Sequence, residues 1–261
     1  MVSPDSDINT MIASASELIR EAKYCVALTG AGISTPSGIP DFRSPGSGVW
    51  TRYSPMEVAS LSAFRYHPER FYNWLRPFVK KLFEADPNPA HLALAALEEN
   101  GYLSSIITQN IDALHQRAGS KKVIEVHGTY QTLSCPACFQ QVEADIDMLH
   151  TLLENSKIPQ CPLCSTILKP DIILYEEQLP ADKWNHARNE IQICDLLLIL
   201  GSSLTVTPTC DLPLTALAAG ANLLIINRGP THLDTRAEVA IDGNLADFLP
   251  VIVEKVIHEK N

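Results

Sequence analysis

Two pairs of cysteines carry the most specific chemical signal in the sequence. Cys135 and Cys138 form one C-P-x-C pair and Cys161 and Cys164 form the other, with the 22 residues 139–160 between them. Four thiolates complete the tetrahedral shell of one Zn²⁺ and leave no coordination position open for a substrate. We therefore predict one structural zinc ion bound by these four residues. The alternative is a set of reduced cysteines that hold no metal.

A glycine-rich turn is the second candidate for chemistry. The apolar run 24–29 ends at the stretch 30–34, Gly-Ala-Gly-Ile-Ser. A buried strand that stops at paired glycines is typical of a loop whose backbone N–H groups approach a phosphate. The alternative is a tight turn that needs glycine for its backbone angles alone. Two prolines exclude a continuous helix over 36–44. The same segment contains Asp-Phe-Arg at 41–43, which adds a carboxylate, an aromatic ring and a guanidinium to the candidate site.

Polar residues or glycine follow four further predicted strands. They are Gln109, Asn110 and Asp112 after 103–108, His127 after 123–126, Gly201, Ser202 and Ser203 after 195–200, and Asn227 after 223–226. The carboxyl ends of parallel strands share one edge of a sheet, so we expect these residues to line a dinucleotide site. His127 is the candidate general base, because an imidazole titrates near neutrality. Taken singly, His127 could be structural, and Asp112 could be a helix N-cap.

The elements that must position these residues alternate between helix and strand. Helical spacing of apolar residues predicts helices near 8–22, 68–84, 89–100, 181–193, 211–219 and from 244, and the stretch 54–57, Ser-Pro-Met-Glu, predicts a capping box at the start of another. The continuous apolar run 195–200 is typical of a strand buried on both faces. The sequence therefore predicts an α/β fold, a Rossmann-like doubly wound parallel sheet.

The predicted sheet is interrupted twice. We expect a Rossmann-like domain over 1–34, 85–131 and 171–261, a cofactor loop and helical insertion over 35–84, and a zinc-ribbon module over 132–170, where the alternation stops. A chain of 261 residues is long enough to bury the core that this division requires.

Composition excludes several classes of partner. The formal net charge of −10 argues against a nucleic-acid backbone and is compatible with a lysine-bearing substrate. No apolar run reaches the roughly 18 residues that a membrane-spanning helix needs. Residues 1–9 are polar and acidic, unlike a signal peptide, and the paired cysteines favour metal over disulfides, so we predict a cytoplasmic protein.

Taken together, these motifs resemble the sirtuins, a family of NAD-dependent protein deacylases. The resemblance rests on Gly-Ala-Gly-Ile-Ser, Gly-Ile-Pro-Asp-Phe-Arg, Thr-Gln-Asn-Ile-Asp, His-Gly, the two C-x-x-C pairs, Gly-Ser-Ser-Leu and Ile-Asn, which follow the family's order from about residue 20 to 250. It implies a smaller domain, made of the helical insertion and the zinc ribbon, beside the Rossmann-like one. It also implies that NAD is consumed to deacetylate lysine, which releases nicotinamide and O-acetyl-ADP-ribose.

The resemblance implies roles for individual residues. His127 would be the general base, with Asn110 and Asp112 as the other catalytic residues. Around NAD, the nicotinamide pocket would be shaped by Ala31, Ile39, Asn110 and Asp112. The reacting ribose would be contacted by Phe42 and Gln109, and the diphosphate by Arg43, Gly30 and Gly32. The adenosine half would be lined by Ser202, Ser203 and Asn227. The remaining expected cofactor-binding residues are Ser34, Asp41, Ile111, Gly201 and Ile241.

The segment 169–177 is similar to the family's peptide-binding edge. The Ile173 carbonyl would accept the N–H of the acyl-lysine, with Tyr175 nearby and Val206 on the other side of the peptide. Glu176 stands where the family usually has glycine, so its side chain could alter the approach of the peptide and could favour basic sequences.

The choice of acyl group is also predicted from this resemblance. Desuccinylating members of the family carry an arginine three residues after a tyrosine, whereas here Tyr72 is followed by Arg76, four residues on. One extra position turns a helical side chain by about 100°. We therefore expect a neutral acyl group such as acetyl.

Three other functions compete with deacetylation. Mono-ADP-ribosyl transfer would share the cleavage of nicotinamide, and an NAD-sensing binding module would need no base at residue 127. A hydride-transferring dehydrogenase fits less well, because the third glycine of its fingerprint is absent.

Overall fold

The computed structural model describes residues 4–44, 46, 48–154 and 157–258. Its main sheet has six parallel strands in the order β3-β2-β1-β7-β8-β9. The strands are β3 (Val123–Glu125), β2 (Ser105–Thr108), β1 (Cys25–Thr29), β7 (Leu196–Leu200), β8 (Asn222–Asn227) and β9 (Val239–Asp242). The chain starts at the centre of the sheet and winds outward in both directions, which confirms the predicted doubly wound α/β fold.

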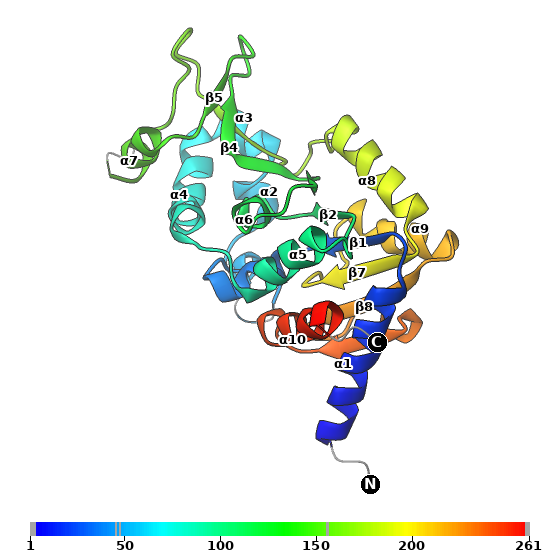
Figure 1. The fold of residues 1–261 in the computed structure, drawn as a ribbon. Coiled ribbons are helices and arrows are strands. Elements are labelled where there is room, and N and C mark those ends of the chain that lie inside the picture. Colours follow the sequence, from blue (N-terminus) through cyan, green and yellow to red (C-terminus); the bar gives the residue numbers. More distant parts are fainter. Residues whose placement is uncertain (1–3, 45, 47, 155–156, 259–261) are drawn as a thin grey trace.

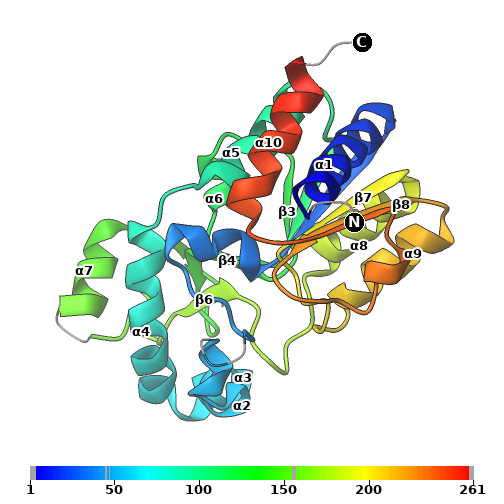
Figure 2. The ribbon, with the colours of Figure 1, turned by 90° about the horizontal axis from the view of Figure 1, so that it is seen from below.

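Helices cover both faces of this sheet (Figures 1 and 2). One face packs against α1 (Pro4–Glu21), α5 (Pro89–Glu99) and α10 (Leu245–His258), and the other against α8 (Ala181–Ile193) and α9 (Leu212–Ala218). Ala27 of β1 points to the first face and Leu28 to the second, and both are fully buried. This burial on two sides explains why the central strands are continuous apolar runs.

A second, smaller part lies beside the carboxyl edge of the sheet (Figure 2). It contains the helices α2 (Pro55–Val58), α3 (Leu61–Tyr66), α4 (Pro68–Glu84) and α7 (Ile146–Glu154), and an antiparallel sheet of β5 (Gln141–Glu143), β4 (Gly128–Ser134) and β6 (Lys169–Ile172). One apolar cluster joins α4, α7 and β6 through Leu75, Leu152 and Ile172. The insertion and the cysteine module therefore share a core.

Short elements complete the chain. They are α6 (Leu114–Arg117) and the 3₁₀ helices η1 (Ala31–Ser37), η2 (Val49–Thr51), η3 (Thr209–Asp211) and η4 (Asp234–Arg236). In the part of the chain that the structure describes, no helix is long and apolar enough to cross a membrane.

The structure confirms the positions of the long helices and corrects several short elements. The helices expected over 68–84 and 181–193 are α4 and α8. The expected capping box at Ser54 is wrong: α2 begins at Pro55, but the Ser54 side chain makes no capping bond, and the Glu57 carboxylate pairs with Arg70 instead. Strand β9 was not expected, because its four residues are too few to show an alternating pattern. Helix α7 was not expected either; it lies between the cysteine pairs, where the zinc-ribbon module was predicted without helices.

The two loops that follow β1 and β7 touch through glycine. A Cβ atom on Gly32 would lie 2.7 Å from the Gly201 Cα, and a Cβ on Gly30 would lie 2.8 Å from the Gly201 carbonyl oxygen. Gly201 itself has a left-handed backbone, with φ of 64°. Only glycine permits this approach of one backbone to another, which therefore fixes the start of η1 against the end of β7.

Candidate active site

A cleft of about 1330 Å³ opens at the carboxyl ends of β1 and β7, where the strand order reverses. In doubly wound folds this reversal point is where ligands bind. Most residues predicted from the sequence line it: Gly30, Ala31, Gly32, Ser34, Ile39, Asp41, Phe42, Arg43, Gln109, Asn110, Ile111, Asp112, His127, Ile173, Tyr175, Gly201, Ser202, Ser203, Val206 and Asn227. The structure thus brings together side chains from segments far apart in the chain.

Ile241 is the one predicted cofactor-binding residue that does not line the cleft. Its side chain is 5% exposed and packs in the core under α10. The residues that line this end of the cleft come just after β9: Gly243, Asn244 and Leu245.

His127 is held in the orientation that a general base needs. Its Nδ1 lies 2.9 Å from the Gln109 carbonyl oxygen, so Nδ1 donates and Nε2 keeps a free lone pair. Burial lowers the pKa of His127 from its usual 6.5, the Gln109 carbonyl raises it, and the Arg43 charge lowers it further. The imidazole is therefore neutral at pH 7 and able to accept a proton.

A buried polar pocket lies where the loops after β1 and β2 meet. The Ser34 hydroxyl donates to Asp112 Oδ2 over 2.6 Å, and the Asn110 amide donates to Ser34 Oγ over 3.0 Å. Burial raises the pKa of Asp112, while the hydrogen bonds from Ser34 and the Leu114 N–H lower it. Asp112 Oδ1 also accepts from the Leu114 N–H at 3.0 Å, but the N-cap of α6 is Ala113, so Asp112 is not the N-cap that its sequence position suggests.

His91 extends this network, and the sequence analysis missed it. Its Nδ1 accepts from the Asn88 N–H at 3.3 Å, so Nε2 carries the proton and lies 3.5 Å from Ser34 Oγ. Burial lowers the pKa of His91 to about 4. This histidine stands in the first turn of α5, where its sequence position indicates only a capping role. His91 lies behind Ser34 and is not itself part of the cleft wall, whereas Trp50, Trp74 and Phe78, which were also missed, line the cleft.

The glycine loop differs from the expected phosphate cradle. The Gly30 N–H donates to the Leu200 carbonyl over 3.1 Å, and the Gly32 N–H donates to the Gly201 carbonyl over 2.9 Å. Both N–H groups are therefore engaged by the end of β7. The glycines are required for the contact between the two loops. The cations on the cleft wall are the side chains of Arg43, Lys81 and Arg228, and Arg43 is exposed.

The segment after β6 gives the cleft an open backbone edge. The Ile173 N–H donates to the His127 carbonyl over 2.8 Å, and within the described residues no group donates to the Ile173 carbonyl. Val206 lines the cleft as well. An extended peptide could pair with this edge beside the imidazole.

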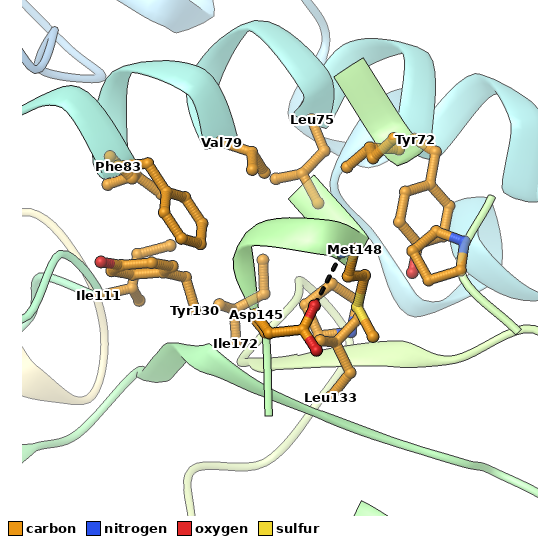
Figure 3. A pocket seen from close by; sticks show the side chains of 15 residues that line it. Tyr72, Leu75, Val79, Phe83, Ile111, Tyr130, Leu133, Asp145, Met148 and Ile172 are labelled. Carbon is orange, nitrogen blue, oxygen red and sulfur yellow. Dashed lines mark hydrogen bonds between the residues drawn. The ribbon is translucent and has the colours of Figure 1, made fainter. Parts of the chain in front are cut away.

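A second pocket beside the cleft is almost wholly apolar (Figure 3). It lies between α4, α7 and the small sheet, and it shares Leu75, Leu82, Ile111 and Ile172 with the cleft. Its one carboxylate, Asp145, accepts from the Met148 N–H over 2.7 Å at the start of α7. The pocket is lined mainly by apolar side chains, whereas the histidine and the buried polar network lie at the cleft.

The four cysteines of the C-P-x-C pairs form one cluster. Their sulfur atoms all lie within 4.8 Å of one another, with Sγ–Sγ distances of 3.5 Å for Cys135–Cys164, 3.5 Å for Cys138–Cys161 and 3.6 Å for Cys138–Cys164. Zn–S bonds of about 2.3 Å in a tetrahedron require about 3.8 Å between sulfurs. The donor set fits one Zn²⁺ with a closed shell, which ties the two turns of the ribbon together.

The fold and the cleft define a class: a doubly wound α/β protein whose cleft, at the point where the strand order reverses, holds a neutral histidine, a buried polar pocket and an open backbone edge. A model of the Sir2 family matches residues 30–208. The chain belongs to the Sir2 family, as its motifs predicted.

Relatives and solved structures of the Sir2 family are similar to this chain over almost its whole length. It is 43% identical to NAD-dependent protein deacylase 2 of Archaeoglobus fulgidus, over 94% of this chain and 96% of that protein. It is 41% identical to the NAD-dependent protein deacetylase of Thermotoga maritima, over 92% and 96%. A Sir2 structure that holds a deacetylated p53 peptide and 3′-O-acetyl ADP-ribose superposes with a TM-score of 0.88, at 40% identity, over 94% and 98% of the two chains.

The cysteine cluster predicts one zinc ion per chain. We expect Cys164→Ser to lower the zinc content measured by atomic emission, because a hydroxyl is a poorer zinc ligand than a thiolate. Cys210→Ser, which changes a cysteine outside the cluster, should keep one zinc. Chelation should increase amide hydrogen exchange in β4 and β6 while β1 and β7 stay protected. A wild-type chain without zinc would contradict the closed site described.

The surroundings of His127 predict its titration. Its imidazole should titrate below 6.5 in an NMR pH series, with His127→Gln used to assign the resonance, because burial disfavours the charged form. Arg43→Ala should move the pKa back up, since one positive charge is removed. A base must be neutral, so activity should fall as the pH drops through this lowered pKa. Titration at or above 6.5 would show that the imidazole is not buried as the structure places it.

Proposed function

We propose that this protein is an NAD-dependent protein lysine deacetylase, which releases nicotinamide, deacetylated lysine and O-acetyl-ADP-ribose. One observation carries the proposal: His127 faces the cleft with a free Nε2 while its own carbonyl holds Ile173 at 2.8 Å. The base and the peptide edge are therefore one unit. The names of the relatives, NAD-dependent deacylase and deacetylase, support the same reaction.

The cleft residues have distinct tasks in this reaction. When bound, NAD supplies a glycosidic bond to nicotinamide that breaks as the acyl oxygen of lysine attacks the ribose carbon. Asn110 and Asp112 orient the carboxamide of nicotinamide by hydrogen bonds, and burial makes those bonds strong. Arg43 faces the diphosphate. Gln109, which donates to Ser202 Oγ over 3.0 Å, links the ribose side of the cleft to the adenosine side formed by Ser202, Ser203 and Asn227.

His127 moves the proton that the second half of the reaction requires. Its Nε2 accepts a proton from a ribose hydroxyl, whose oxygen can then attack the acyl carbon; water and the breaking of the acyl C–N bond release lysine and leave the acetyl group on the ribose. Nδ1 stays bonded to the Gln109 carbonyl, which stabilises the imidazolium that forms. Phe42 lines the same cleft, and in this proposal its ring shields the reacting ribose face.

The partner is a protein or peptide that carries acetyl-lysine. The Ile173 carbonyl accepts the N–H of the acylated lysine, and Val206 borders the other side. The net charge of −10 favours such a lysine-bearing peptide over nucleic acid, and no membrane partner is proposed.

The surroundings of Tyr72 and Arg76 support a neutral acyl group. The Tyr72 hydroxyl donates to the Leu168 carbonyl, and Arg76 Nε donates to the Leu152 carbonyl over 2.9 Å. Both groups are engaged by the zinc-ribbon side of the small domain. Neither residue is among those that line the cleft, which argues against their pairing with the carboxylate of a succinyl group.

We also propose how the chain divides into domains and where in the cell it acts. A Rossmann-like domain over 1–34, 85–131 and 171–261 would carry NAD, and the parts over 35–84 and 132–170 would close the peptide side of the cleft. The protein would act in the cytoplasm, where reducing conditions keep zinc-binding cysteines as thiolates.

The reaction predicts a defined set of products. Mass spectrometry after mixing the chain with NAD and an acetyl-lysine peptide should detect deacetylated peptide, nicotinamide and O-acetyl-ADP-ribose. His127→Ala should lower deacetylation about a hundredfold or more, because the general base is lost. A succinyl-lysine peptide should react more slowly than the acetyl peptide.

Other products would redirect the proposal. Nicotinamide together with an ADP-ribosylated protein, and no deacetylation, would indicate mono-ADP-ribosyl transfer. Absence of nicotinamide release from the folded, zinc-loaded chain would favour an NAD-sensing module.

A further inference from the structure

Glu176 has a backbone conformation that a glutamate rarely adopts. Its φ is 73°, in the left-handed region, where a side chain costs conformational energy and glycine does not. The residue lies on the wall of the cleft, three positions after Ile173. A strained residue at such a site persists when its surroundings hold it in place.

The carboxylate of Glu176 is bonded to the helical insertion. Its Oε2 accepts from the Ser62 N–H over 2.8 Å, at the second residue of α3. The Ser62 hydroxyl and the Ser62 N–H lower the pKa of Glu176, and the Arg65 charge lowers it too. The side chain is thus ionised at neutral pH and turned toward α3.

Tyr175 joins the same two parts of the chain through its backbone. Its N–H donates to the Ala59 carbonyl over 3.0 Å, and its carbonyl accepts from the Leu61 N–H over 3.0 Å. Its side chain meets the cofactor loop, because the hydroxyl accepts from Arg43 over 3.2 Å and the ring packs edge-on against Trp50 at 6.1 Å. The segment 173–177 therefore contacts both the insertion and the loop.

The other end of the segment is fixed separately. The Leu174 N–H donates to Glu177 Oε2 over 2.8 Å, and the same carboxylate pairs with Lys169 over 2.9 Å with both side chains mostly buried. Between this ion pair and the Tyr175 backbone bonds, the Glu176 carboxylate adds a side-chain hydrogen bond from the segment to α3.

We propose that Glu176 is a positioning residue for the peptide substrate: its carboxylate clips the segment 173–177 to α3, so that the Ile173 edge is formed before the peptide arrives. This inference rests on the proposed deacetylase function. A preformed edge binds more tightly than one that is populated part of the time, since the apparent affinity falls with the fraction of competent molecules.

The structure favours this role over the charge-based preference expected from the sequence. A carboxylate that selects basic peptides would point into the cleft with its charge unpaired. Here the carboxylate accepts from the Ser62 N–H, and the Arg65 charge, also on the insertion, lowers the pKa of Glu176. Glu176 therefore acts through the backbone geometry of its neighbours.

Steady-state kinetics with three substitutions separate these roles. Glu176→Ala should raise the peptide KM about tenfold, the effect of losing one charge-assisted hydrogen bond, and leave kcat and the NAD KM within about twofold. Glu176→Gln should stay near the wild-type value, because its amide oxygen still accepts from Ser62. Glu176→Gly, which removes both the strain and the clip, should resemble Glu176→Ala. Glu254→Ala, an exposed change on α10, is the matched control.

Two outcomes would overturn the proposal. One is a peptide KM in Glu176→Ala and Glu176→Gly that equals the wild-type value. The other is a Glu176→Gln variant that loses affinity for peptides with basic flanks and keeps it for those with acidic flanks, which would indicate selection by charge.

A second readout does not depend on the proposed function. Amide hydrogen exchange at Leu61 and Tyr175 should be faster in Glu176→Ala than in wild type, with an unchanged melting temperature and unchanged exchange in β1. If the wild-type chain has no deacetylase activity, the proposed function fails, while faster exchange still supports the clip and unchanged exchange rejects it.

Discussion

The close contact between Gly30, Gly32 and Gly201 is the constraint on which the site depends. The backbone after β1 lies so close to the end of β7 that a single methyl group added to Gly30 or Gly32 would collide with the Gly201 backbone. The N–H groups of Gly30 and Gly32 donate to carbonyls at that end of β7, so η1 starts from a fixed point. Ser34 lies two residues after Gly32, so the fixed start of η1 also fixes the position of its hydroxyl. That hydroxyl donates to Asp112 Oδ2, in the loop after β2, at a distance of 2.6 Å.

Burial then determines what the polar groups of the cleft can do. His91 and His127 are held neutral because burial lowers the pKa of each, while burial raises the pKa of Asp112. A neutral imidazole accepts a proton, and a buried carboxylate that already accepts from Ser34 holds an amide in one orientation. In the proposed reaction, the same low-dielectric surroundings would favour both nicotinamide binding and base catalysis.

The fold and the main chemistry could be predicted from the sequence because those signals are local. Paired cysteines, glycines after a buried strand and polar residues at strand ends each occupy a few consecutive positions, and the structure brings them together as expected. His91, Trp50 and Trp74 were missed because their roles arise from packing between segments far apart in the chain. Ile241 was expected to meet the cofactor, yet its side chain packs in the core. The use of the Gly30 and Gly32 N–H groups could not be predicted, since it depends on the distance to β7.

Catalytic efficiency toward NAD, measured as kcat/KM for Gly32→Ala beside Gly220→Ala, tests the role of the glycine contact most directly. Gly220 has a left-handed backbone, with φ of 92°, and no atom lies within 4 Å of the position that an added Cβ would occupy. Its substitution by alanine therefore costs stability without causing a clash. We expect a loss of about a hundredfold for Gly32→Ala, because a shift of about 1 Å displaces Ser34 from Asp112, and little change for Gly220→Ala. A folded Gly32→Ala chain with wild-type efficiency would show that the site does not depend on this contact.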